Sequence, residues 1–226
     1  MSFQLNRIVP WGRTFDEYVA MFELSAHDLG QRILGCGDGP ASFNAELTAQ
    51  GGEVISIDPL YLFETEAIQD RVKVTYPQVL QQVALNESQY VWTQVGSIQN
   101  LGQIRMNAMN AFLADYPQGC ADGRYIAEAL PSLSFPEQSF DLALCSHFLF
   151  LYDEQLDLDF HLSSIKELCR VAKEVRMFPL LNLAGETSQH LDPVLGYFMS
   201  RNYDVEVKQV AYEFQKGGNQ MLCISA

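Results

Sequence analysis

The chain has 226 residues, of which 48% are hydrophobic and 19% are charged, so it can bury an ordinary core without a metal or disulfide staple. Basic residues number 14 and acidic residues 28, and the formal net charge of −14 argues against nucleic acid as a partner because such a field repels polyphosphate. No apolar run approaches the roughly 18 residues that a membrane-spanning helix needs. The first residues show no apolar core of signal-peptide length.

The cysteine pattern favours reduced thiols. The five cysteines are odd in number, are scattered along the chain and form no CxxC pair. This pattern indicates neither a zinc site nor a disulfide framework, and free cysteine is commonly buried. We therefore expect a cytoplasmic protein without a bound metal.

The first 62 residues predict the opening of a parallel α/β sheet. An N-terminal part, 1–30, combines an extended arm with a helix over 14–25 that Thr14 caps. A strand then enters the glycine turn of RILGCGDGP, a helix follows over 41–52, and a second strand covers 53–58. Strand, turn, helix and strand form a βαβ unit, whose crossover should be right-handed.

Residues 64–115 predict a helical insertion after the second strand. The segment is rich in Gln, Asn, Ala and Met, and it is longer than a simple crossover requires. We expect helices over 64–71, 75–86 and 100–115, ended by a turn at 117–119. The insertion would serve either as a lid or cap over a substrate, or only as a shield for one sheet edge.

The remaining residues predict the rest of the sheet. Strands are expected over 123–130, from 140 onward, over 174–182, and in a final hairpin of 203–214 and 219–225, with helices over 158–173 and 188–202. The whole chain, 1–226, thus predicts one α/β domain. Its fold class is a Rossmann-like, mostly parallel seven-stranded sheet with an antiparallel last strand and helices on both faces.

A glycine turn and an acid about 20 residues beyond it point to a ligand. Gly35, Gly37 and Gly39 permit a sharp turn and let a ligand lie on bare backbone, and the next helix offers free N–H groups. Asp58 ends the second strand, where an acid can accept hydrogen bonds from both hydroxyls of a ribose. The pattern predicts a nucleoside-containing cofactor, with a tight turn and an Asp-Pro turn as the purely structural alternative.

Three stretches resemble the class I S-adenosylmethionine-dependent methyltransferases of the small-molecule group often labelled "type 11". ILGCGDG resembles the family's glycine motif, VISIDPL its ribose-binding strand, and LSFPEQSFDLALCSHFLFL the segment that leads into its fourth strand. The resemblance covers about 31–62 and 124–225 and leaves out the N-terminal part and the insertion. It implies S-adenosylmethionine as the cofactor and a small-molecule methyl acceptor as the partner.

The resemblance also implies a set of cofactor-binding residues at the ends of the first four strands: Gly35, Cys36, Gly37, Gly39, Asp58, Pro59, Leu60, Glu128, Ala129 and Ser146. In this set the glycine turn surrounds the methionine part and Asp58 holds the ribose. Pro59 and Leu60 lie against the adenine ring, and 128–129 lie near its edge.

His147 follows Ser146 where cofactor and acceptor would meet, so it is the candidate general base, or else a residue that only caps the strand end. One position departs from the family. An acid usually stands two residues before the first glycine, and this chain has Ile33 there. Glu17 and Tyr18 are candidates to replace it, and the planar guanidinium of Arg13 could pair with the cofactor carboxylate.

Two other functions stay open. A non-catalytic cofactor-binding or interaction protein on the same fold is favoured by the missing acid at Ile33. A nicotinamide-dependent oxidoreductase is less favoured, because the glycine spacing is GxGxG rather than GxGxxG. The acceptor is not identified, although the acidic balance favours a small neutral or cationic molecule.

Overall fold

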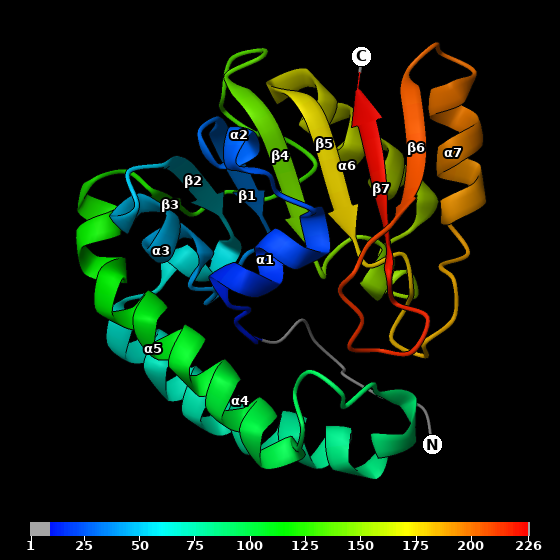
Figure 1. The fold of residues 1–226 in the computed structure, drawn as a ribbon. Helices are drawn as coiled ribbons and strands as arrows, with labels where there is room; N and C mark the ends of the chain where they lie inside the picture. The colour runs from blue at the N-terminus through cyan, green and yellow to red at the C-terminus, as the bar shows by residue number, and fades with distance from the viewer. Residues whose placement is uncertain (1–9, 226) are drawn as a thin grey trace.

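The computed structural model describes residues 10–225, so the part of the predicted arm at 1–9 lies outside the described residues. Its sheet has seven strands in the order β3-β2-β1-β4-β5-β7-β6 (Figure 1). The strands are β1 (Arg32–Cys36), β2 (Glu53–Ile57), β3 (Tyr125–Ile126), β4 (Phe140–Ser146), β5 (Ala172–Phe178), β6 (Asp204–Gln209) and β7 (Gln220–Ser225). Strands β1 to β5 are parallel, and β7 is antiparallel to both β5 and β6. The predicted fold class is therefore confirmed.

Helices cover both faces of the sheet. The α-helices are α1 (Phe15–Phe22), α2 (Ala26–Leu29), α3 (Phe43–Ala49), α4 (Thr65–Leu85), α5 (Ile98–Ala121), α6 (Leu158–Val171) and α7 (Leu191–Met199), and short 3-10 turns occur at Pro59–Leu62, Glu87–Gln89 and Phe150–Tyr152. Residues of α1 and α3 share one core cluster with Ile33, and residues of α6 and α7 share another with Leu34 and Cys36. This division follows from the strand, because successive side chains point to opposite faces.

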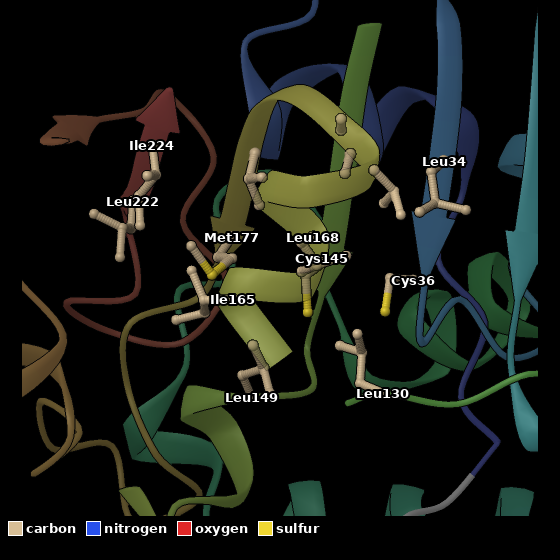
Figure 2. Close-up of a cluster of buried hydrophobic side chains, with 14 of the residues drawn as sticks. Leu34, Cys36, Leu130, Cys145, Leu149, Ile165, Leu168, Met177, Leu222 and Ile224 are labelled. Carbon is tan, nitrogen blue, oxygen red and sulfur yellow. The ribbon is translucent and has the colours of Figure 1, made fainter. Parts of the chain in front are cut away.

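The larger core cluster lies between the sheet and α6 (Figure 2). Cys36 and Cys145 are side by side in it because β1 and β4 pair in parallel with these two residues in register. The neighbouring Cys145 thiol and burial both raise the pKa of Cys36, which keeps it a protonated thiol. Cys36, Cys145 and Cys223 are buried as expected, whereas Cys120 is exposed.

The first helix agrees with the sequence. Helix α1 begins after Thr14, whose hydroxyl accepts from the N–H of Glu17 while the Glu17 carboxylate accepts from the N–H of Thr14. This reciprocal pair is a capping box, which satisfies two N–H groups that the first turn would otherwise leave open. The helix ends at Phe22 rather than at 25, and the short α2 follows.

The predicted three-helix insertion is wrong in its details. Residues 65–85 form one continuous helix, α4, through Pro77, instead of two helices separated near 72–74. The reason is a buried stripe, Ile68, Val72, Thr75, Val79 and Val83, which keeps helical spacing across the proline. Packing along that stripe offsets the hydrogen bond that proline removes.

The predicted turn at 117–119 is also wrong, because α5 continues through Pro117 to Ala121. One residue on each side of the proline is buried, Tyr116 before it and Gly119 after it. The hydroxyl of Tyr116 donates to the carbonyls of Tyr61 and Phe63, and a Cβ on Gly119 would lie 2.3 Å from the ring of Tyr125. Tertiary contacts thus extend the helix beyond the local stop signal.

Several other boundaries differ from the prediction, among them the ends of α3, β5 and α7. Strand β3 has only two residues, so Glu128 and Ala129 lie in the loop after it. Helix α6 ends at Val171, and 172–173 belong to β5. The last two strands pair as an antiparallel hairpin, but β6 ends at Gln209, and 210–219 form a loop rather than a four-residue turn.

The two ends of the helix pair α4–α5 lie against different parts of the fold. Near the sheet, Phe112 and Tyr116 pack with Tyr61 and Tyr125 and so cover the β2–β3 edge. Farther along, the pair passes below the carboxyl ends of the strands, where the arrowheads of β4 and β5 point toward it (Figure 1). Within residues 10–225 no helix combines the length and the apolar character needed to cross a membrane.

Candidate active site

A cavity of about 430 Å³ lies at the carboxyl ends of the parallel strands. Its walls come from the segments that follow β1, β2, β3, β4 and β5, together with parts of the insertion and of the β6–β7 loop. In open α/β sheets, ligands bind at this edge, where the strand order reverses between β1 and β4.

Ten of the eleven candidate residues line this one cavity: Cys36, Gly37, Gly39, Asp58, Pro59, Leu60, Glu128, Ala129, Ser146 and His147. Gly35 is the exception and is not on the cavity wall. A Cβ at Gly35 would lie 1.8 Å from a carboxylate oxygen of Asp38, so this glycine is required by the protein's own turn. Contact between Gly35 and a ligand stays a prediction.

The glycine turn has the left-handed backbone that the sequence predicts. Gly37 has φ +69° and Gly39 has φ +51°, values that side-chain-bearing residues rarely adopt. A Cβ on Gly37 would lie 3.1 Å from the Cβ of Phe148, and one on Gly39 would point toward Asp58 at 3.9 Å. The turn therefore presents bare backbone to the cavity, between the two strand ends.

The Asp58 carboxylate is fixed by the turn it faces. One oxygen accepts from the N–H of Leu60 at 2.7 Å, and the other accepts from the N–H of Gly39 at 3.0 Å. Burial raises the pKa of Asp58, against the lowering effect of these two N–H groups and of the charge on Arg71. Each oxygen keeps a further lone pair for a ligand hydroxyl. Asp58 thus both caps a turn and offers a buried acceptor.

The acid that the sequence analysis missed is Asp38, inside the glycine turn itself. Its carboxylate accepts from the hydroxyl of Tyr18 at 2.8 Å and from that of Ser56 at 2.6 Å, and it lines the cavity. Burial raises its pKa to about 6, although both hydroxyls lower it. Its carboxylate occupies the space in front of Gly35, two residues along β1 from Ile33. The signal in the sequence that could have identified it is its place as an acid inside the glycine motif.

The residues proposed from helix α1 and the segment before it separate into two groups. Tyr18 and Arg13 line the cavity, and the buried Nε of Arg13 has no hydrogen-bond partner, while its Nη1 donates to the carbonyl of Trp11 at 3.0 Å. Glu17 is not on the wall. Its carboxylate accepts from both Nη atoms of the buried Arg105 and from the Tyr212 hydroxyl. Glu17 is therefore excluded as the replacement for the missing acid.

His147 has a strained backbone at the end of β4. Its φ is +51°, unusual for a residue with a side chain, and its N–H donates to the carbonyl of Phe178 at 2.6 Å. Nδ1 lies 3.0 Å from the Ser146 hydroxyl, so Nε2 is the ring nitrogen that this contact does not occupy. Burial, followed by the charges of Arg13 and Arg105, lowers the pKa of His147 well below its usual value. The ring is therefore neutral at pH 7.

The half of the cavity away from the glycine turn has walls that the sequence did not predict. They come from α4, the α4–α5 connection and the two loops after β5 and β6, and they include Val79, Val83, Tyr90, Leu183 and Phe214. Two of these segments are joined by backbone hydrogen bonds, from the N–H of Val91 to the Phe214 carbonyl at 2.7 Å and from the N–H of Lys216 to the Gln89 carbonyl at 2.9 Å.

Comparison with solved structures agrees with this architecture. The PH0226 protein from Pyrococcus horikoshii OT3 overlaps with a TM-score of 0.50 at 10% identity, covering 93% of this chain and 90% of that one. WbdD, described elsewhere as a bifunctional kinase-methyltransferase, overlaps with a TM-score of 0.50 at 14% identity, covering 93% of this chain and 40% of WbdD. With the strand order and the antiparallel β7, this defines the class I S-adenosylmethionine-dependent methyltransferase fold.

Comparison of sequences identifies a relative of this chain. The chain belongs to the same family as the uncharacterized protein MJ0045 of Methanocaldococcus jannaschii, with 34% identity over 221 residues that span 97% of each chain. No family model matches the chain.

Proposed function

We propose that this protein transfers a methyl group from S-adenosylmethionine to a small-molecule acceptor. The observation that carries the proposal is the convergence on one cavity of a bare glycine turn, two buried carboxylates and a guanidinium with an unpartnered nitrogen. These groups match the parts of an adenosyl amino acid: ribose hydroxyls, an ammonium group and a carboxylate.

The nucleoside end would be held by the segments after β2 and β3. Asp58 has buried carboxylate lone pairs at the position where a ribose is held in nucleotide-binding α/β folds. Pro59 and Leu60 provide an apolar wall for the adenine ring, and Glu128 and Ala129 lie on the same cavity. Glu128 accepts from the N–H and the hydroxyl of Ser134, which orients its carboxylate.

The amino-acid end would be held by Asp38 and Arg13. Both donors that contact Asp38 are neutral hydroxyls, so they do not neutralise its buried negative charge. A cationic group of the ligand, such as an ammonium, would do so. Arg13 offers a donor without a partner and a planar fork suited to a carboxylate. Asp38 thereby supplies, from within the turn, the anion that Ile33 cannot.

When bound, S-adenosylmethionine supplies an electrophilic methyl group on a sulfonium that leaves as a neutral thioether. The chain's own task is to position that group and to exclude water, and these two effects account for much of the rate of such a displacement. His147 is neutral and lies on the cavity wall beside Ser146. It would accept, at Nε2, the proton of an acceptor that must lose one.

Asp58→Ala is expected to weaken binding of the demethylated product, S-adenosylhomocysteine, by about 1–3 kcal/mol, since a buried acceptor for charged or hydroxyl partners contributes on this scale. Isothermal calorimetry measures the change. Asp204→Ala, an exposed aspartate at the start of β6, is the matched control and should bind as the wild type does. Unchanged affinity in Asp58→Ala would remove this residue from the ligand site.

Asp38→Asn is expected to weaken S-adenosylhomocysteine binding by roughly tenfold or more, because hydrogen bonds to charged groups contribute about 1.5–3 kcal/mol. Binding of 5′-methylthioadenosine, which lacks the amino-acid group, should change little. A general loss of turn structure would weaken both ligands, so the difference between them isolates the contact with the ammonium. Equal effects on the two would contradict this role of Asp38.

The same contact predicts a pH dependence. Because the pKa of Asp38 is about 6, lowering the pH below that value protonates the carboxylate and should weaken S-adenosylhomocysteine binding to the wild type. Asp58 faces the same carboxyl and raises its pKa, while Tyr18 and Ser56 lower it. In Asp38→Asn the affinity should be nearly flat over the same range.

The alternatives have distinct outcomes in the same experiments. An oxidoreductase would bind NAD and not S-adenosylmethionine. A non-catalytic binding protein would bind S-adenosylhomocysteine but incorporate no labelled methyl group when metabolite extracts are screened. Binding of neither cofactor would contradict the proposed function.

A further inference from the structure

The charged side chains of the cavity are unevenly distributed. Asp38, Asp58 and Glu128 all come from the turns after β1, β2 and β3, and Arg71 acts on the charge of Asp58. Arg13 lies with Tyr18 on the wall beside the glycine turn. The three carboxylates and Arg71 belong to the end assigned to the cofactor. Arg13 lies between the two halves, because its charge also acts on Tyr90 and His147.

The other half is apolar and aromatic. Val79 and Val83 of α4 face it, and both are nearly fully buried. Trp11, Tyr90 and Phe214 add aromatic surface, with the last two rings stacked 4.8 Å apart at 22°. Among residues 10–225, no carboxylate or ammonium group lines this half.

The polar groups there are neutral. The Tyr212 hydroxyl is already used, because it donates to Glu17 at 2.9 Å. The remaining neutral groups include the side-chain amide of Gln215 and the imidazole of His147, whose lowered pKa keeps it uncharged. The charge that reaches this half is that of Arg13, whose guanidinium is assigned above to the cofactor carboxylate. With the cofactor bound, a charged molecule placed here would therefore lose its water without gaining an unpaired opposite charge, which is costly.

We propose that this half of the cavity binds the methyl acceptor, and that the acceptor is an uncharged, ring-sized apolar molecule which presents its nucleophile to His147. This inference rests on the proposed function. The net charge of the chain favours a neutral or cationic acceptor, and this inference reduces that class to neutral acceptors. The reason is that acidic residues are absent from the described walls of this half, and the overall field governs encounter rather than fit.

The test uses three probes of one size and different charge: 1-naphthol, 1-naphthoate and 1-naphthylmethylammonium. Calorimetry with S-adenosylhomocysteine at saturation should show binding of 1-naphthol, with both charged analogues at least about tenfold weaker because their desolvation is not repaid. An ammonium probe that binds as tightly as 1-naphthol, or 1-naphthol that does not bind at all, would overturn the inference.

A charge substitution provides the second measurement. Gln215→Glu is nearly isosteric and adds one carboxylate to this wall, so the preference for 1-naphthol over 1-naphthylmethylammonium should shrink severalfold or reverse. Gln209→Glu, exposed at the end of β6, adds the same charge outside the cavity and should leave the preference unchanged. Identical behaviour of the two variants would contradict the assignment.

A third variant tests the place of binding. Val83→Trp should fill the apolar half of the cavity and abolish 1-naphthol binding, while S-adenosylhomocysteine still binds. Leu85→Trp, on the exposed side of the same helix, should still bind both ligands. If Val83→Trp does not fold, the Gln215→Glu comparison decides. Failure of the wild type to bind S-adenosylhomocysteine would count against the proposed function, whereas 1-naphthol binding to the protein alone would still support the apolar chamber.

Discussion

Arg105→Leu is expected to lower the free energy of unfolding by about 3–5 kcal/mol, the largest stability effect of any single substitution considered for this chain. The Arg105 side chain is 1% exposed and that of Glu17 13%, and the two join helix α5 of the insertion to α1. Tyr212 adds the β6–β7 loop to the same carboxylate. Removing the guanidinium would leave the largely buried Glu17 carboxylate without its ion-pair partner. Urea unfolding followed by circular dichroism measures the loss.

Two further variants separate a buried charge pair from ordinary packing. Lys73→Leu breaks an exposed ion pair with Asp70 on α4 and should cost less than about 1 kcal/mol. The double variant Glu17→Gln/Arg105→Leu should recover part of the stability that Arg105→Leu loses, because no uncompensated charge is left. If Arg105→Leu is as stable as the wild type, the contact between Glu17 and Arg105 does not hold the insertion in place.

The Glu17–Arg105 pair also has a defined pH signature. Burial alone would raise the pKa of Glu17, but the charge and hydrogen bonds of Arg105 outweigh it and lower the pKa to about 2, below the ordinary 4.5. The pair's stabilisation is therefore fully present above about pH 4.5 and is lost as the pH falls toward 2. The difference in unfolding free energy between wild type and Arg105→Leu should shrink over that range.

Gly37→Val is expected to weaken S-adenosylhomocysteine binding by at least about 100-fold, near 3 kcal/mol, when calorimetry compares it with the wild type. Valine is strongly disfavoured at φ +69°, and its Cβ would lie 3.1 Å from Phe148 before the two branches are added. The turn must therefore move, and its bare backbone, together with Asp38 and Gly39, moves with it.

Gly51→Val is the matched control for this substitution. Gly51 also has positive φ, +86°, but a Cβ there meets no atom within 4 Å, and the residue lies away from the cavity. The control should share the backbone strain, lose some stability and keep its affinity for S-adenosylhomocysteine. If Gly37→Val binds as well as this control, the turn only shapes the protein and does not form a ligand site.

The site residues that sequence reasoning predicted share one property: each lies at the carboxyl end of a strand or in the segment just after it. Parallel strands bring their carboxyl ends to one edge, so Gly37, Asp58 and Ser146 meet whenever the sheet forms. Asp38 stood inside the same motif, but its role depends on the hydroxyls of Tyr18 and Ser56, which come from α1 and β2. No spacing rule connects those positions.

The alternating and helical patterns of hydrophobic residues, with the glycine turn, predicted the fold class, most of the helices and strands, and the residues at the glycine-turn end of the cavity. These features depend on neighbours in sequence. The unbroken α4 and α5, the Glu17–Arg105 pair and the apolar chamber between α4 and the 210–219 loop were decided only by the tertiary structure. Burial of a continuous side-chain stripe outweighs the local effect of a proline, and contacts between segments more than a hundred residues apart, such as Tyr90 and Phe214, have no local signal.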